Sequence, residues 1–348
     1  MENKQPKILL VGGGTLGSVS PLLAISEKYK AEYLFVGSED GPEKDFVLSQ
    51  GINNFQAIKS GKLRRYFDWQ NFTDLWRIKI AFWQSLKIIW QFKPDIVLSA
   101  GSFVAVPMVW AAWLMRKPVI VHQQDILVGL ANRLMAPLAK KITVVFPEQV
   151  ANFNNKKTVI TGNPIRRSKT KLDKDGRLIV ITGGGLGARS MNKFLAPFIP
   201  KMIAAGFKVY HLLGTKNADQ ALNPELVEGE GYYSDKFVKT GMLDILSQAD
   251  IIISRAGMSL ISEAAALKKA LVLIPLTNTH QERNASFLAK RNAAVMIRQG
   301  NDQIMDRYLD KLLTKEELRL GLGANLYQLF PKNAVNDYII LIDKILNE

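Results

Sequence analysis

The sequence contains no cysteine and only three histidines, His122, His211 and His280. A disulfide framework and a thiolate metal site are therefore excluded. The histidines lie far apart and lack the spacing of a metal-binding motif, so we expect no metal centre. We also expect no other cofactor.

Long apolar segments are also missing. The longest uncharged apolar stretch, Phe103 to Met115, is too short to span a bilayer and contains Pro107. The first seven residues are polar and lead directly into an apolar run, without the hydrophobic core of a signal peptide. We therefore expect a protein of the cytosol or of a membrane surface.

Acidic residues are scarce relative to basic ones: 31 Asp and Glu oppose 46 Lys and Arg, which gives a net charge of +15. A basic surface attracts nucleic acid, anionic lipid or phosphorylated substrates, and composition alone does not choose among them. The 348 residues, of which 47% are hydrophobic, suffice for two domains, each with its own core.

Short apolar runs alternate with longer helical patterns. Several runs are continuous in Val, Ile and Leu, as in parallel strands covered on both faces, so we expect α/β units with right-handed crossovers. The expected strands are Ile8–Val11, Tyr33–Val36, Ile96–Ser99, Val119–His122, Thr143–Phe146, Leu178–Thr182, Lys208–Leu212, Ile251–Ser254 and Val272–Pro275.

The pattern restarts once. A glycine turn, Gly12–Gly17, follows the first strand, and a second, Gly183–Ala188, follows the strand that begins at Leu178. Between them Thr161–Pro164 is typical of a linker. We predict an α/β protein of two Rossmann-like domains, 1–163 and 164–332, with a final helix in 333–348 that packs back on the first domain.

Each glycine turn lies between a strand and a helix, where backbone N–H groups can bind an anion. A tight turn needed only for packing is an equal alternative. NAD binding is disfavoured because Tyr33–Val36 leads into Gly37-Ser38 and not into an acidic residue.

Two further segments in the second half carry candidate binding residues. In Ser254–Glu263, Ser259 can donate to a phosphate and Glu263 can accept two ribose hydroxyls, although a merely capped helix has the same pattern. The polar loop Pro275–Ala285 suits sugar hydroxyls, or is an ordinary solvated loop.

All six tryptophans fall between residues 69 and 113, in a region rich in Lys and Arg. Four recur every seven residues and so share one helix face. Tryptophan beside basic residues is typical of a membrane-headgroup interface, whereas the alternative is a core helix. The predicted membrane-contacting residues are Trp69, Phe72, Trp76, Trp83, Trp90, Trp110 and Trp113.

Taken together, these motifs resemble the MurG family over nearly the whole chain. The similar segments, in order, are Gly12–Pro21, Pro94–Val97 with Gly101–Val104, His122–Asp125 with Gly129–Asn132, Gly162–Arg166, Gly183–Asn192, Arg255–Gly257 with Ser262-Glu263, and His280–Ala285. The resemblance implies a GT-B fold, in which a cleft separates an N-terminal acceptor domain from a C-terminal donor domain.

The resemblance also implies an activity: inverting transfer of N-acetylglucosamine (GlcNAc) from its UDP-sugar. The acceptor would be the C4 hydroxyl of N-acetylmuramoyl-peptide (MurNAc-peptide) on undecaprenyl pyrophosphate, in peptidoglycan synthesis. The enzyme would sit peripherally on the cytoplasmic face of the plasma membrane, with an anionic membrane surface and no nucleic acid as partner. The implied substrate-binding residues are Thr15, Leu16, Gly17, Asn132, Arg166, Gly185, Lys239, Ser259, Leu260, Glu263, His280 and Gln281.

Five positions depart from the family pattern. Ser18 stands where the family has a histidine near the reaction centre, Leu16 replaces a glycine, Gly185-Leu186 replaces Ser-Gln, and Asp125 replaces an asparagine. Serine is a weak general base at neutral pH unless it is activated. The candidate catalytic residues are therefore Asp125 first, then His122, with Ser18 as the residue that inherits the histidine's place.

Two alternatives stay open. One is a related transferase that uses another lipid acceptor. The other is a GT-B binding or scaffold protein that lost turnover with its histidine.

Overall fold

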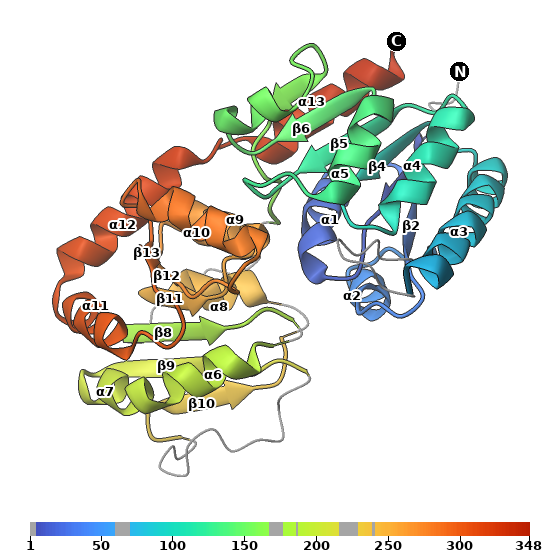
Figure 1. The fold of residues 1–348 in the computed structure, drawn as a ribbon. Coiled ribbons are helices and arrows are strands. Elements are labelled where there is room, and N and C mark those ends of the chain that lie inside the picture. Colours follow the sequence, from blue (N-terminus) through green and yellow to red (C-terminus); the bar gives the residue numbers. More distant parts are fainter. Residues whose placement is uncertain (1–4, 60–69, 167–176, 186, 216–228, 239–240) are drawn as a thin grey trace. The chain divides into compact units, whose positions relative to one another are not determined.

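The computed structural model describes residues 5–59, 70–166, 177–185, 187–215, 229–238 and 241–348, and it divides into two compact units. The first unit comprises residues 1–124, 128–166 and 331–348, and the second comprises 125–127 and 167–330. The sequence predicted domain limits at 163 and 332. Figure 1 shows each unit as a sheet covered by helices.

The first unit is built on a seven-stranded parallel sheet in the order β3-β2-β1-β4-β5-β6-β7. Residues of β1 are fully buried from Ile8 to Val11, because helices cover both faces of the sheet. The strands are β1 (Lys7–Val11), β2 (Glu32–Ser38), β3 (Phe55–Ile58), β4 (Ile96–Ser99), β5 (Val119–Gln123), β6 (Lys141–Val144) and β7 (Thr158–Ile160).

Alternate residues of these strands enter two different cores. Leu9 and Val11 pack with α3, α4 and α5, whereas Ile8 and Leu10 pack with α1 and α13. The helices are α1 (Ser20–Ser26), α2 (Glu43–Ser49), α3 (Gln70–Phe92), α4 (Ala105–Leu114), α5 (Leu130–Met135) and α13 (Ala334–Leu346), with 3₁₀ turns at Leu16–Ser18, Ala136–Leu138 and Pro147–Asn152.

The C-terminal helix α13 belongs to the first unit. Its apolar stripe, which includes the fully buried Tyr338 and Ile342, joins the core below β1. On its polar side the Tyr29 hydroxyl donates to Asp343 Oδ1 at 2.6 Å, and Lys28 bonds Asn336. These contacts fix the last helix against α1.

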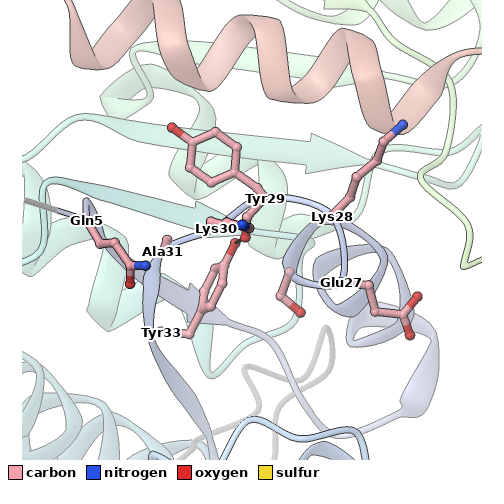
Figure 2. A pocket seen from close by; sticks show the side chains of 8 residues that line it. Gln5, Glu27, Lys28, Tyr29, Lys30, Ala31 and Tyr33 are labelled. Atoms are coloured by element: carbon pink, nitrogen blue, oxygen red, sulfur yellow. Dashed lines mark hydrogen bonds between the residues drawn. The ribbon is translucent and has the colours of Figure 1, made fainter. Parts of the chain in front are cut away.

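A shallow pocket lies beside this junction (Figure 2), lined by residues that include Gln5, Tyr29 and Tyr33. The Tyr33 hydroxyl donates to the backbone oxygen of Tyr29 at 2.7 Å. The pocket is at the amino ends of β1 and β2. Because α/β sheets bind ligands beyond the carboxyl ends of their strands, we do not assign this pocket to the functional site.

The second unit holds a six-stranded parallel sheet in the order β10-β9-β8-β11-β12-β13. Its strands are β8 (Arg177–Thr182), β9 (Phe207–Leu212), β10 (Tyr232–Asp235), β11 (Ile251–Ser254), β12 (Ala270–Leu273) and β13 (Val295–Met296). Its helices are α6 (Arg189–Leu195), α7 (Ile199–Ala204), α8 (Met242–Gln248), α9 (Met258–Ala266), α10 (His280–Ala289), α11 (Asp302–Thr314) and α12 (Glu316–Leu329), with a 3₁₀ turn at Ala196–Phe198.

Both sheets have the doubly wound order in which the first strand of the unit is central and the chain leaves it in both directions. The predicted class, α/β with two Rossmann-like domains, is confirmed. Each glycine turn follows such a central strand, β1 or β8, at its carboxyl end. The candidate residues are therefore found at the edge where this fold places ligands.

Candidate functional site

The first glycine turn is closed by Ser18. This side chain is 8% exposed, and its hydroxyl lies 3.1 Å from the Gly13 oxygen and 3.2 Å from the Thr15 oxygen. The same oxygen accepts from Gly13 N at 3.1 Å. The Ser18 hydroxyl thus bonds the backbone of its own turn, while Thr15 is exposed and Leu16 and Gly17 are half-buried.

His122 is at the end of β5 and is 1% exposed. Its Nδ1 lies 2.8 Å from Thr143 Oγ1 and its Nε2 lies 2.9 Å from Asn163 Oδ1. Burial lowers the pKa of His122 to about 4, against the smaller opposing effect of these hydrogen bonds. The imidazole is therefore neutral at pH 7, with both nitrogens bound inside the unit.

Asn132 is also an interior residue, 6% exposed, at the start of α5. Its amide donates to the His122 carbonyl at 3.1 Å and to Gln123 Oε1 at 2.7 Å. Gln124 extends this group by donating to the Gly17 carbonyl at 3.1 Å. Buried amides therefore connect the end of β5 to the first glycine turn.

Arg166 lies in the first unit, just after the predicted linker Thr161–Pro164. Its guanidinium bonds Gln50, the C-cap residue of α2, and lies 5.4 Å from the ring of Phe46 on α2. The role at the phosphates that the resemblance implies for Arg166 stays a prediction.

The second glycine turn depends on close packing against the helix that follows. A Cβ on Gly183 would collide with the Ala188 side chain and backbone, so only glycine fits there. Gly184 has a left-handed φ of 86° with open space beside it, and its N–H donates to Thr182 Oγ1 at 3.3 Å. Gly185 is half-buried, and its carbonyl accepts from Thr215.

The segment after β11 places its candidates on α9. Ser259 and Leu260 are half-buried in the first turn, and Glu263 is 8% exposed one turn later. All three follow the Gly257 N-cap, whose backbone is extended. The spacing sets the Ser259 hydroxyl and the Glu263 carboxylate on adjacent turns of one helix face.

Arg255 organises this edge of the sheet, a role that the sequence did not reveal. It is 9% exposed, and it donates to the carbonyls of Ile274 and Pro275 at 2.9 and 3.3 Å. Its other nitrogen reaches Ser190 Oγ at 2.9 Å and Gln299 Oε1 at 3.1 Å. One buried guanidinium thus joins the ends of β11 and β12 to the start of α6.

The loop before α10 is held by its own side chains. Thr279 caps the helix by accepting from Gln281 N at 3.2 Å, and Gln281 Oε1 accepts from Leu276 N at 3.1 Å. His280 is exposed, and its Nε2 lies 3.9 Å from Asp125 Oδ2.

Asp125 belongs to the second unit, where it is bonded by Asn284, a fully buried residue on α10. Asn284 Nδ2 donates to Asp125 Oδ1 at 2.8 Å and to the Ala256 carbonyl at 3.0 Å, and its Oδ1 accepts from Ile126 N at 3.0 Å. The Asp125 side chain is 32% exposed. Asn284 therefore connects the candidate base directly to the turn before α9. The sequence analysis placed Asn284 in a polar loop, whereas the residue lies inside α10.

The tryptophans of α3 are on the surface. Trp76, Trp83 and Trp90 are 65%, 70% and 67% exposed, which contradicts the alternative of a core helix. Trp110 and Trp113 are exposed on α4, which packs against α3. The neighbouring basic residues Arg77, Lys79, Lys87 and Lys93 are exposed as well.

Some predicted residues are not described. Trp69 and Lys239 lie outside the described residues, and Phe72 lies in the first turn of α3, where side chains are not described. Within the described ranges, no helix combines the length and apolarity that a membrane span requires. The same ranges contain no cluster of three or more His, Asp or Glu arranged to hold a metal ion.

Comparison with known proteins covers both units. Residues 8–144 match the glycosyltransferase family 28 N-terminal domain, and residues 178–321 match the family 28 C-terminal domain. A UDP-N-acetylglucosamine–N-acetylmuramyl-(pentapeptide) pyrophosphoryl-undecaprenol N-acetylglucosamine transferase of Clostridium botulinum (strain Hall) is 37% identical over 92% of each chain. The transferase of the same name from Clostridium novyi is 35% identical over 97% of this chain and 98% of the relative.

Solved structures agree on the architecture. The crystal structure of Acinetobacter baumannii MurG, 24% identical, covers 97% of this chain and 99% of its own, with a TM-score of 0.72. A Staphylococcus aureus MnaA–UDP structure, 14% identical, covers 98% of this chain and 97% of its own, also with a TM-score of 0.72. These likenesses show the GT-B fold. With the two domain matches and the full-length relatives, they place the chain in glycosyltransferase family 28, as a member of the MurG family.

Proposed function

We propose that this protein transfers GlcNAc from UDP-GlcNAc to the C4 hydroxyl of a lipid-linked MurNAc-peptide, with inversion, in peptidoglycan synthesis. The observation that carries the proposal is the 37% identity over 92% of both chains to a transferase named for this reaction. The candidate donor residues support it, because they gather at the carboxyl edge of one sheet.

In this proposal the second unit binds the donor. Glu263 accepts the ribose hydroxyls, and Ser259 with the first turn of α9 donates to the diphosphate. The loop with His280 and Gln281 binds the sugar. Helix N-termini and backbone N–H groups stabilise the negative charge that develops on departing UDP.

Asp125 takes the proton from the acceptor C4 hydroxyl. Asn284 supports this assignment because it holds Asp125 Oδ1 and the Ala256 carbonyl at once, so the carboxylate is fixed relative to the donor turn. Asp125 is partly exposed, as a base that meets a second substrate must be. His122 suits the role less well, since it is buried with both nitrogens bound.

We further propose that the exposed tryptophans of α3 and α4 rest on an anionic membrane, on the cytoplasmic face of the plasma membrane. Large exposed aromatic side chains beside Lys and Arg suit the headgroup region. A lipid-linked acceptor would then reach the enzyme by diffusion within the bilayer.

A transfer assay tests the proposed function. The protein is incubated with labelled UDP-GlcNAc and a synthetic lipid-linked MurNAc-peptide, and label is counted in the lipid phase. We expect transfer that needs both substrates. Tight UDP binding without transfer would instead support the scaffold alternative. That alternative is considered because Ser18 replaces the family histidine. Transfer to a different lipid acceptor would support the related-transferase alternative.

A further inference from the structure

The first glycine turn encloses a carboxylate of the chain itself. Glu43, the first residue of α2, is fully buried against the turn. Its Oε2 accepts from Gly14 N at 3.1 Å, and its Oε1 accepts from Ser38 N at 2.6 Å and Ser38 Oγ at 2.5 Å. Three donors therefore converge on one buried carboxylate.

Two glycines that lie against the Glu43 side chain cannot be replaced by a residue with a Cβ. A Cβ built on Gly13 or on Gly41 would overlap the Glu43 carboxylate. Glycine at these two positions is thus explained by the approach of an internal anion. The sequence pattern of the Gly12–Gly17 turn suits an external anion or a turn needed only for packing.

All three N–H groups of the triple glycine are already bonded inside the unit. Gly12 N donates to the Val36 carbonyl at 3.2 Å, Gly13 N donates to Ser18 Oγ, and Gly14 N donates to Glu43. An incoming phosphate at this turn would have to displace a buried carboxylate of the same charge. That displacement costs both the hydrogen bond and the repulsion between like charges.

The second glycine turn has no such arrangement among its described residues. There the Gly184 N–H donates to a neutral hydroxyl, that of Thr182, and a Cβ on Gly184 would meet open space. The two turns share a sequence pattern but differ in electrostatics. Beside Gly184 the described residues of the second turn place no carboxylate, whereas the anion position of the first turn is filled.

We propose that Glu43 is the internal anion of the first glycine turn, a positioning residue that excludes phosphate from Gly14 and shapes the turn for an uncharged ligand group. The identity of the uncharged group rests on the proposed function: the exposed side of Thr15–Gly17 binds a sugar hydroxyl or amide of the acceptor. The acceptor diphosphate binds elsewhere.

Nuclear magnetic resonance of the backbone amides tests the proposal without any need for transfer activity. Inorganic pyrophosphate is titrated into wild-type protein and into Glu43→Gln, which keeps the shape of the side chain and removes its charge. We expect the Gly14 amide to be protected from hydrogen exchange and unmoved by pyrophosphate in the wild type. In Glu43→Gln it should exchange faster and shift at concentrations at least about tenfold lower than any that affect the wild type.

Two matched variants serve as controls. Glu39→Gln makes the same chemical change at an exposed position nearby, and Ser38→Ala removes one donor but leaves the carboxylate; both should respond like the wild type. In the transfer assay, Glu43→Gln should raise the acceptor KM about tenfold while leaving the donor KM unchanged, a split that general unfolding would not produce.

A Gly14 amide that shifts with pyrophosphate equally in wild type and variant would overturn the proposal. If Glu43→Gln does not fold, the wild-type titration alone decides, because a saturable shift of the Gly14 amide there contradicts an occupied anion position. If the wild-type Gly14 amide does not respond to pyrophosphate but no transfer is detected, the result counts against the proposed function and not against the role of Glu43.

Discussion

Glu263 is the side chain whose predicted role depends most on its place in α9. It is buried one turn after the N-terminal turn, where a carboxylate can accept two ribose hydroxyls. Loss of a charge-assisted hydrogen bond costs about 1.5–3 kcal/mol. We expect Glu263→Ala to weaken UDP binding by about one to two orders of magnitude.

Isothermal calorimetry with UDP measures this effect. Glu317→Ala, an exposed glutamate on α12, is the matched control and should bind UDP normally. Equal UDP affinity in Glu263→Ala and the control, with both proteins folded, would remove Glu263 from the donor site.

Asp125 carries the catalytic prediction. Asp125→Asn retains an oxygen that can accept from Asn284 Nδ2 and so preserves the local shape, but it cannot take a proton. General-base loss should lower turnover by about 100-fold or more, with UDP affinity retained. Turnover is measured under saturating donor and acceptor.

Asp302→Asn, at an exposed position in the first turn of α11, controls for the lost charge. Ser18→Ala should cost less than Asp125→Asn, because the Ser18 hydroxyl bonds the backbone of its own turn. Near-normal turnover in Asp125→Asn together with collapse in Ser18→Ala would show that serine is the base.

At single positions, the sequence indicates which residues are candidates for the site, but not how buried they are or which side chains they contact. Asp125 and Glu263 were identified from their place after a strand or in a helix, which follows from chain order alone. The burial of His122, and the partner that Asn284 finds in Asp125, depend on residues 21 to 159 positions away. Such long-range contacts leave no local pattern in one sequence.

Among the elements, α3 offers the clearest test. Its tryptophans repeat every seven residues and project from the unit, so their apolar rings can enter a headgroup layer. Transferring a large apolar side chain out of water contributes about 1.5–3 kcal/mol. The double change of Trp76 and Trp83 to Ser should therefore reduce binding to anionic vesicles by at least about a hundredfold.

Vesicle co-sedimentation, with UDP calorimetry as the check on folding, measures the effect. Leu320→Ser replaces an apolar residue that is 63% exposed on α12 and should leave vesicle binding unchanged. Added salt should weaken binding of the wild type, because Lys and Arg surround the tryptophans. Vesicle binding that is unaffected by the Trp76 and Trp83 substitutions and by added salt would exclude α3 from membrane contact.

The elements themselves were largely predictable. All nine expected strands exist, with ends displaced by up to two residues, as for β6 and β12. The four strands that the sequence did not predict, β3, β7, β10 and β13, are the edges of the two sheets. Edge strands here have two to four residues and are less buried, so they lack the continuous apolar runs of the central strands.

For the molecule as a whole, two buried histidines predict acid sensitivity. Burial lowers the pKa of both His122 and His211 to about 4 in the folded state, whereas an unfolded histidine titrates near 6.5. Below pH 6.5 the unfolded chain therefore binds more protons, and stability falls as the pH decreases toward 4. Each histidine should remove about 2 kcal/mol from the free energy of unfolding between pH 7.5 and pH 5.

Chemical unfolding of wild type, His122→Gln and His280→Gln at the two pH values measures this dependence. His122→Gln should be less stable at pH 7.5 but lose less on acidification. His280→Gln, at an exposed site, should keep the wild-type difference. An identical pH dependence in all three proteins would mean that His122 has the same pKa in the folded and the unfolded state, which would contradict the effect of its burial.

The central claim concerns the whole molecule: one chain transfers the sugar of UDP-GlcNAc to a lipid-linked acceptor with inversion, and UDP is released. The most direct measurement is the structure of the product that the purified protein makes from ¹³C-labelled UDP-GlcNAc and synthetic lipid-linked MurNAc-peptide, determined by nuclear magnetic resonance. The account predicts a single β-linked GlcNAc on the C4 oxygen of MurNAc and one UDP released per linkage. An α-linked product, attachment at another oxygen, or release of free GlcNAc without lipid-linked product would contradict it.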